Sequence, residues 1–445
     1  MHRSFILAAA FILSVVTTLA AQQTPSAAPA ASGNKLLSDD LNGEFPKWLR
    51  LSAEYRARVE GYTGGGFKPN SEDGYFLSRV RINMFLLPKT WLKFGFQGQD
   101  AHVFGKNQNP AAPPYQDSMD LRQAYIELGD TEKKTVGIRA GRQELAFGDE
   151  RLIGNANWLN TARSFDGLRG TLRHGGYRVD LFAARVVKLQ DAEFDWSTPG
   201  NNLYGIYGGI EKLVPKATVE PYFLWRRQSG LKTELGTPGI SNFGTVGVRW
   251  VGKFPANFDY GTEMDKQAGS QGTDTISAWA GHWVLGQTLV NARFKPRFSV
   301  EYNYASGDRN PKDGTRGTFD QLYPTAHDKY GLADQVGWKN IRNARAGLDL
   351  KLANKWGLTG RYDAWWLADP HDALYSAASA VIARNTAGTA GRFVGQELDS
   401  VLAYKFSRYL QVSGGYGHIF PGTFLNHTTP GDSYNFPYAS TTLVF

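Results

Sequence analysis

The stretch TVGIRAGRQELAFGDERLIGNANWLNTARSFDGLRGTLR, which spans residues 135–173, decides the fold. Both of its ends alternate with the two-residue period of a β-strand. Ile138 and Arg139 point to opposite faces near the start, and Leu168 and Arg169 do so near the end. A strand with one apolar face and one arginine-bearing face separates an apolar phase from water. Because a long loop rich in both charge signs joins the two strands, we interpret the stretch as part of the wall of an aqueous pore.

The N-terminus has the features of a secretory signal. Arg3 precedes an apolar run over residues 5–19, and two small residues follow. The run is short for a membrane anchor, and a segment rich in Ala, Pro and Ser comes directly after it. The sequence therefore predicts a signal peptide over residues 1–21, a flexible periplasmic leader over 22–47 and a barrel domain over 48–445.

The composition of the full chain is typical of a membrane β-barrel. It contains 50 Gly, 21 Tyr and 26 Phe but no Cys, and its mean hydropathy is −0.38. No later segment has the roughly twenty consecutive apolar residues that a membrane helix requires. The formal net charge of +8 is modest and suggests anionic partners; we expect no nucleic-acid partner.

Alternating segments with the length of a tilted membrane-crossing strand recur along the chain. Counting them predicts an all-β, transmembrane antiparallel β-barrel of about 18 strands. The segments are 48–60, 76–87, 91–103, 121–128, 136–143, 165–173, 177–187, 203–212, 218–227, 243–252, 258–267, 275–285, 297–305, 341–352, 356–367, 396–406, 410–419 and 435–445.

The connections between these segments alternate in length, which is typical of a bacterial outer-membrane barrel with short periplasmic turns and long extracellular loops. Examples are the short turns 88–90 and 353–355 and the long connections 144–163 and 307–336. The connection 267–274 belongs to the long set by its place but is short. The sequence thus predicts a protein embedded in outer-membrane lipid. Phe445 ends the last alternating strand, and we expect the outer-membrane insertion machinery to recognise it.

Projected onto such a barrel, the polar strand faces line the lumen and carry many arginines. Guanidinium groups stay charged and suit carboxylate or phosphate groups, so successive arginines give an anion several weak sites. The alternative is that lumen charges only pair with one another, but arginine exceeds its acidic partners. Arg122 is an exception, because it shares the apolar face. The predicted basic substrate pathway is Arg56, Arg58, Arg79, Arg81, Arg139, Arg169, Arg249, Arg297, Arg345 and Arg361.

Enzymatic signals are weak. The chain has none of the common hydrolase, zinc-protease or nucleotide-binding motifs, and its histidines are scattered. Asp349 and Asp363 lie on adjacent predicted strands, where glycoside chemistry would use paired carboxylates, but ion pairs are the simpler interpretation. We therefore predict no catalytic residues, no cofactor and no metal site.

The motif residues resemble the alginate export porin family. The resemblance rests on Gly141-Arg142-Gln143, on GDERLIG at 148–154, on Phe165-Asp166-Gly167 and on DLRQAYIEL at 120–128, together with Trp158, Asn160 and Arg163. It implies an eighteen-stranded outer-membrane barrel that passes an anionic polysaccharide through an arginine-rich constriction. We assign to this constriction or loop motif Arg142, Asp149, Arg151, Arg163 and Asp166.

In a member of that family, a long periplasmic turn between strands sixteen and seventeen obstructs the pore. The corresponding turn here is only 407–409, so no plug of that kind is expected, whereas the outer loop 104–119 is long enough to fold over the mouth. The sequence predicts passive, anion-selective passage of an acidic polysaccharide or oligosaccharide, of the alginate or uronate type. The alternatives are a general or small-anion uptake porin and an outer-membrane enzyme acting on lipid or glycan.

Overall fold

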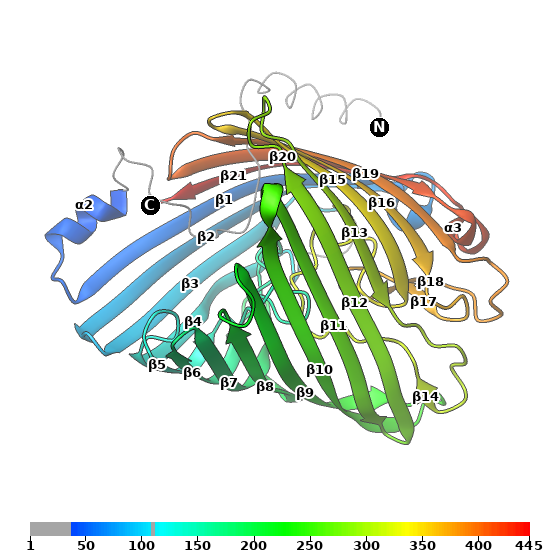
Figure 1. Ribbon diagram of the computed structural model, residues 1–445, viewed down its shortest axis with the longest axis horizontal. Helices are drawn as coiled ribbons and strands as arrows, with labels where there is room; N and C mark the ends of the chain where they lie inside the picture. The colour runs from blue at the N-terminus through cyan, green and yellow to red at the C-terminus, as the bar shows by residue number, and fades with distance from the viewer. Residues whose placement is uncertain (1–36, 108–111) are drawn as a thin grey trace.

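The computed structural model describes residues 37–107 and 112–445, and these form a closed antiparallel barrel of 18 strands (Figure 1). The predicted signal peptide and most of the predicted leader lie outside the described residues. The barrel strands are β1 (Leu49–Thr63), β2 (Glu72–Lys89), β3 (Leu92–Phe104), β4 (Asp117–Gly129), β5 (Val136–Gln143), β6 (Phe165–His174), β7 (Tyr177–Lys188), β8 (Trp196–Ile210), β9 (Ala217–Lys232), β10 (Pro238–Phe254), β11 (Phe258–Gln271), β12 (Asp274–Thr288), β13 (Arg297–Ala305), β15 (Ile341–Ala353), β16 (Trp356–Leu367), β19 (Phe393–Lys405), β20 (Leu410–Pro421) and β21 (Tyr434–Val444).

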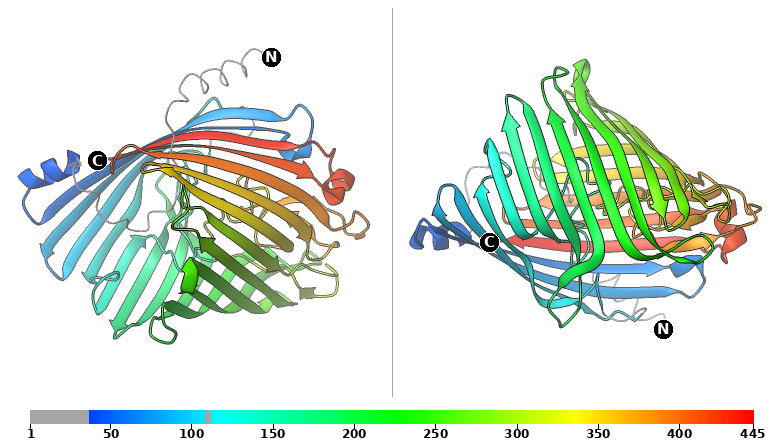
Figure 2. Two further views of the ribbon diagram at one scale, coloured as in Figure 1. Left: turned by 45° about the horizontal axis from the view of Figure 1, so that its top comes forward. Right: turned by 90° about the horizontal axis from the view of Figure 1, so that it is seen from below.

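The ring closes because β1 pairs with β2 on one side and with β21 on the other. Every other barrel strand pairs with its neighbours in chain order (Figure 2). Three short strands lie in the connections: β14 (Thr315–Arg316) is parallel to β12, while β17 (Ala373–Tyr375) and β18 (Val381–Arg384) form a hairpin. The predicted fold, an antiparallel barrel of about 18 strands, is confirmed.

Side chains alternate along the strands between an apolar outer face and a polar inner face. On β2, Ile82 and Met84 are exposed while Arg79 and Arg81 are buried; on β10, Val246 is exposed beside the buried Thr245. The exposed apolar side chains are those that a bilayer covers, so the two-residue period sets which residues face the interior.

The two ends of the barrel differ. Short turns, such as 90–91 and 354–355, lie at the same end as the C-terminus, which we name the turn end; longer connections lie at the opposite end, the loop end (Figure 1). The short connection noted at 267–274 is explained by longer strands. β11 runs on to Gln271 and β12 starts at Asp274, so the two strands extend up to a tight turn instead of ending in a long loop.

Two short α-helices flank the ring, α2 (Leu37–Glu44) and α3 (Thr423–Thr428), with two 3-10 turns, η1 (Gly65–Phe67) and η2 (Pro255–Asn257). Within the described ranges, no helix combines the length and apolar character of a bilayer span. Helix α2 lies in the segment predicted to be a flexible leader, so the end of that segment is ordered. The reason is a two-way anchor: Asn42 Nδ2 donates to Leu51 O, and Leu51 N donates to Asn42 Oδ1, both at 2.8 Å.

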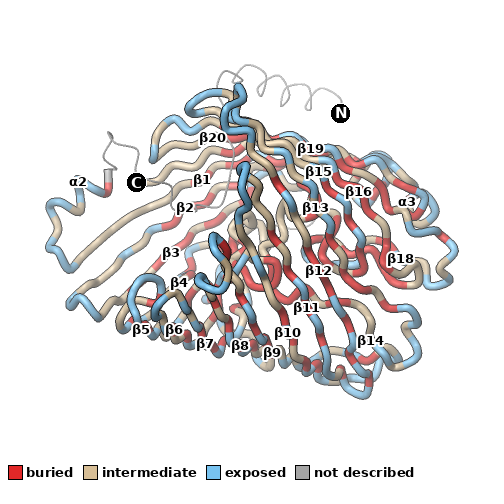
Figure 3. Tube along the Cα trace, viewed as in Figure 1, coloured by how far each residue is buried: buried red, intermediate tan, exposed pale blue. Residues whose placement is uncertain are grey.

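Two of the long connections fold into the barrel and fill part of it. We name residues 144–164, between β5 and β6, the first inner loop, and residues 306–340, between β13 and β15, the second inner loop. Buried stretches of chain run through the interior of the ring (Figure 3). Leu145 and Ile153 of the first loop and Phe319 and Trp338 of the second belong to one cluster of buried hydrophobic side chains.

Candidate functional site

The first inner loop is held against one side of the wall by arginines that the sequence predicts to line the lumen. These arginines come from β1 and β2, where alternation points them inward, and all are buried. Their guanidinium groups donate to oxygen atoms of residues 157–160 rather than to water. The four residues are Arg56, Arg58, Arg79 and Arg81.

The bonds of Arg56 and Arg58 show the geometry. Arg56 Nη1 donates to Asn157 O at 2.8 Å and Arg58 Nη1 donates to Trp158 O at 2.7 Å. The Arg58 guanidinium carbon also lies 3.8 Å from the centroid of the Trp158 ring, which is cation–π contact. Because their donors are bonded to main-chain carbonyls, these buried arginines act as anchors of the loop. They are not a row of exposed cations, and Arg58 and Arg79 also pair with Glu60 and Glu54, both at 2.6 Å.

Arg163 joins the two inner loops. Its Nη1 donates to Gly154 O at 3.1 Å, Tyr323 O at 2.7 Å and Pro324 O at 2.9 Å. Ile153 and Tyr323 form a β-bridge beside it. Burial lowers the pKa of Arg163 to about 10, so the group stays charged at neutral pH. The loops therefore form one joined constriction.

Arg151 and Asp149 of the GDERLIG motif also lie at this junction. Arg151 Nη1 donates to Tyr330 OH at 3.0 Å and Nη2 donates to Glu301 Oε1 at 3.1 Å. Asp149 Oδ1 accepts a bond from Lys329 Nζ at 3.0 Å. Burial acts to raise the pKa of Asp149, but Lys329 and Arg151 outweigh it and hold that pKa below its usual range.

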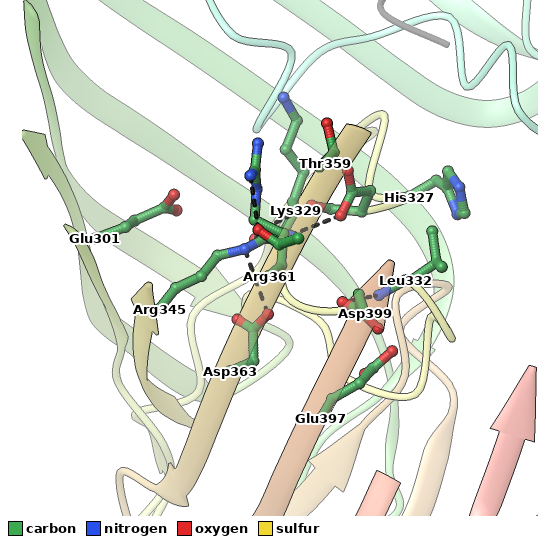
Figure 4. A network of polar contacts seen from close by, with 12 residues as sticks. Glu301, His327, Lys329, Leu332, Arg345, Thr359, Arg361, Asp363, Glu397 and Asp399 are labelled. Atoms are coloured by element: carbon green, nitrogen blue, oxygen red, sulfur yellow. Dashed lines mark hydrogen bonds and ion pairs between the residues drawn. The ribbon is translucent and has the colours of Figure 1, made fainter. Parts of the chain in front are cut away.

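The second inner loop is held against a neighbouring part of the wall, on β15 and β19, by carboxylates and an arginine (Figure 4). On β19, Glu397 accepts a bond from Ala333 N at 2.8 Å, and Asp399 accepts one from Leu332 N at 3.2 Å. Arg345 on β15 donates to Lys329 O at 2.9 Å and pairs with Asp363 on β16 at 3.3 Å.

Between the inner loops and the turn end, three inward carboxylates are each shared by two partly exposed cations. Glu127 pairs with Lys93 and with Arg139, the latter at 3.0 Å. Glu220 pairs with Arg178 at 3.3 Å and Arg249 at 2.6 Å. Asp349 pairs with Arg297 at 3.4 Å and Arg361 at 2.7 Å. We name these three groups the shared-carboxylate sites.

The shared-carboxylate sites differ from the loop anchors in two respects. Their cations are partly exposed, with side-chain exposures of 11–29%. They are also spread around the ring, on β3 and β5, on β7 and β10, and on β13 and β16. Two of the six cations also bond a second carboxylate: Arg178 bonds Asp180 and Arg297 bonds Asp259. Arg169 is buried nearby and pairs with Asp180 at 2.8 Å.

Three charged residues lie elsewhere than the sequence predicts. Arg122, expected on the apolar face, is buried and donates to Gln97 Oε1 at 2.5 Å. The cause is a register shift in the β3–β4 pairing, which makes Arg122 an extra residue and turns it inward. Arg142 and Asp166, assigned to the constriction, bond each other at 2.9 Å. They share the strand faces of the exposed Ile138 and Leu168, so they face outward.

Sequence reasoning missed residues of the inner loops. Tyr323 and Leu332 contribute main-chain groups to the junction, and such groups carry no signal in the sequence. Asn160 was noted only as part of the motif. Its Nδ2 donates to Tyr115 O at 2.9 Å, which ties the first inner loop to the described part of the outer loop 104–119. The carboxylates Asp349 and Asp363 are both paired with arginines.

Comparisons with known proteins agree with this architecture. The crystal structure of Pseudomonas aeruginosa OpdQ aligns with a TM-score of 0.60 and 11% identity, covering 91% of this chain and 99% of that one. For Pseudomonas aeruginosa OccK8 (OprE) the TM-score is 0.60 at 10% identity, with 90% and 99% covered. Pseudomonas aeruginosa OccD3 (OpdP) aligns with a TM-score of 0.58 and 12% identity, covering 89% of this chain and 91% of that one. At such identities the likeness shows the fold.

No curated protein matches the sequence significantly. The family described as alginate export matches residues 47–438, which include the whole barrel except its last few residues. Fold and family together make the protein an outer-membrane channel of the porin type. The chain belongs to the alginate export family.

Proposed function

We propose that the barrel passively conducts an acidic oligosaccharide or polysaccharide of the uronate type, with selectivity for anions. The observation that carries this proposal is the arrangement of the shared-carboxylate sites. Each places two partly exposed cations beside one fixed carboxylate; at Glu127 this leaves an excess of positive charge, while Arg178 and Arg297 each bond a second carboxylate as well. The fixed carboxylate holds the cations in position without neutralising both.

Such sites suit a chain of carboxylates that must move on. A guanidinium binds a carboxylate through a planar fork of donors. Here the protein's own carboxylate competes with the cargo for the same donors, so a bound uronate is exchanged easily. Binding that is favourable but weak, repeated over several sites, is what conduction requires. The inner loops narrow the passage, which favours an extended cargo.

The proposal is tested by recording ion currents through the purified protein in planar bilayers. The reversal potential in a salt gradient measures anion preference, and an oligouronate is compared with a neutral oligosaccharide of equal length as a blocker. The variants Arg249→Gln and Arg361→Gln each remove one cation from a shared-carboxylate site. Arg227→Gln is the matched control, because Arg227 is exposed on the outer face.

Wild-type protein and Arg227→Gln are expected to prefer anions and to be blocked by the oligouronate at lower concentration than by the neutral sugar. In both lumen variants, the preference for anions and the stronger block by the oligouronate are each expected to decrease. A cation-selective wild-type channel would overturn the proposal, as would a selectivity that both lumen variants leave unchanged.

The second candidate is a general or small-anion uptake porin. It is favoured by the pairing of every cation in the shared-carboxylate sites, which leaves only a small net charge. It is also favoured by the short turn 406–409 between β19 and β20, which does not reach into the pore. Equal block by phosphate, simple carboxylates and the oligouronate would favour this candidate.

A further inference from the structure

At the loop end, strand β4 has a free edge. β5 leaves the sheet at Gln143, and its pairing with β4 stops at Ala124, so residues 117–123 pair only with β3. The connection 189–195 between β7 and β8 covers this edge. Its Asp191 accepts bonds from Gln116 Nε2 at 2.7 Å and from Ser118 Oγ at 2.9 Å.

Three buried aspartates meet at this junction. Asp117 and Asp120 belong to β4, Asp195 belongs to the covering connection, and their exposures are 1%, 4% and 7%. One carboxylate oxygen from each lies within 4.8 Å of the other two. Asp117 Oδ1 is buried and has no hydrogen-bond partner among the described residues. A buried carboxylate oxygen without a partner is costly, so it indicates a missing ligand.

Nearby cations do not balance the three charges. Arg142 Nη1 lies 3.6 Å from Asp120 Oδ2, but the same guanidinium already bonds both oxygens of Asp166, at 2.9 and 3.1 Å. Burial, together with the charges of Asp117 and Asp120, raises the pKa of Asp195 to about 8. Asp191 and Asp100 add further negative charge close by.

We propose that Asp117, Asp120 and Asp195 bind a divalent cation of the calcium type. Calcium ligands are oxygens at about 2.3–2.6 Å, so two ligands on opposite sides of the ion lie up to about 5 Å apart. The three oxygens, all within 4.8 Å of one another, lie close enough to share one ion. Magnesium usually keeps several waters and is held through one or two carboxylates, so a set of three buried carboxylates favours calcium. Water fills the remaining positions.

The bound ion fastens the connection 189–195 to the free edge of β4. It closes the wall at the one place where the first inner loop, by turning inward, removes the strand that would otherwise continue the sheet. The site lies at the loop end, whereas the shared-carboxylate sites lie near the turn end.

The test is a calorimetric titration of EDTA-treated, detergent-solubilised protein with CaCl₂. Wild-type protein is expected to bind Ca²⁺ at this site, and Asp117→Asn and Asp195→Asn are each expected to weaken binding at least about tenfold. Asp432→Asn is the matched control, since Asp432 is an exposed carboxylate of another outer loop. Absence of binding by wild-type protein, or equal binding by all four proteins, would overturn the proposal.

A second measurement does not depend on the folding of the aspartate variants. Trp196 directly follows Asp195 and is close enough to transfer excitation to Tb³⁺, which replaces Ca²⁺. Tryptophan-sensitised Tb³⁺ emission is expected in wild-type protein, displaced by Ca²⁺, and is expected to fall in Trp196→Phe while Ca²⁺ affinity stays unchanged. Emission that is not sensitive to Trp196→Phe would place the ion elsewhere and contradict the assignment.

Discussion

A single guanidinium can determine the conformation of two loops. Arg163 donates three bonds to carbonyls of both inner loops from a half-buried position. A charged donor to a main-chain carbonyl contributes more than a neutral one, and leaving the carbonyl unpaired in a buried place is costly. The same chemistry anchors residues 157–160 to β1 and β2. At this scale the arginines of β1 and β2, which are buried, anchor a loop, whereas the arginines of the shared-carboxylate sites are partly exposed.

Replacing Arg163 by Met is expected to weaken the junction by about 2–3 kcal/mol, because buried carbonyls lose their donor while the apolar volume is kept. The measurement is hydrogen exchange at the amide of Gly154, which donates to Tyr323 O at 2.8 Å. Its protection is expected to fall roughly thirty- to a hundredfold. Arg227→Met is the control on the outer face. Unchanged exchange at Gly154 would show that the junction does not depend on Arg163.

The raised pKa of Asp195 predicts a pH dependence. Its folded-state pKa of about 8 lies above the unfolded value of about 3.9. Such a group contributes folding stability that is fully present when the pH is below the unfolded-state pKa and is lost as the pH rises through about 8. In EDTA, the connection 189–195 is therefore expected to dock less tightly at pH 9 than at pH 6.

A nitroxide at Glu193→Cys measures this mobility, and the label is unique because the chain has no cysteine. The spectrum is expected to sharpen between pH 6 and pH 9 in otherwise wild-type protein and to change much less when Asp195→Asn is added. Identical spectra at both pH values in the absence of the second substitution would contradict the prediction.

Residue positions were predictable from the sequence where alternation is regular and not where it is interrupted. Arg79 and Arg81 point inward as their parity requires. Arg122 does not follow its parity, because the register shift in the β3–β4 pairing adds a residue to one strand. Such a shift depends on the partner strand and leaves no mark in the residues of β4 alone.

At the scale of elements, every predicted strand corresponds to an observed strand, because a membrane barrel must alternate along its whole length. The loops were less predictable. The inward course of residues 144–164 is fixed by bonds to β1 and β2, about a hundred residues away in sequence. Local sequence indicates that such a connection is long and charged. It does not indicate that the connection enters the barrel.

The anchoring of the first inner loop can be tested through conductance. Arg79 Nη1 donates to Asn157 O at 3.1 Å and to Leu159 O at 3.3 Å. Replacing Arg79 by Met removes both bonds, each worth about 1.5–3 kcal/mol. The loop is expected to detach part of the time, so the open-channel current rises and fluctuates between levels. Arg227→Met is again the control, and a current identical to that of wild-type protein would show that the constriction does not rely on this anchor.

For the whole molecule, the closed ring and its charged interior depend on each other. Arginines of β1 and β2 bind one inner loop, whereas carboxylates of β16 and β19 take part in holding the other. Because the loops meet in the interior through a buried hydrophobic cluster, the wall and the constriction form one structure. The shared-carboxylate sites lie between this structure and the turn end.

Closure of the ring ends at Phe445, whose backbone bonds Ala53 in both directions, with Phe445 N donating to Ala53 O at 2.8 Å. Phe445→Ala keeps these main-chain bonds and removes only the ring. If the ring serves recognition by the insertion machinery, the variant is expected to refold in detergent to wild-type heat resistance, while the folded fraction in cell membranes falls several-fold. Both are read from heat-modified migration in gels. If the folded fraction falls equally in detergent and in cells, the phenyl ring of Phe445 stabilises the barrel itself. If it falls in neither, the insertion machinery does not recognise this residue.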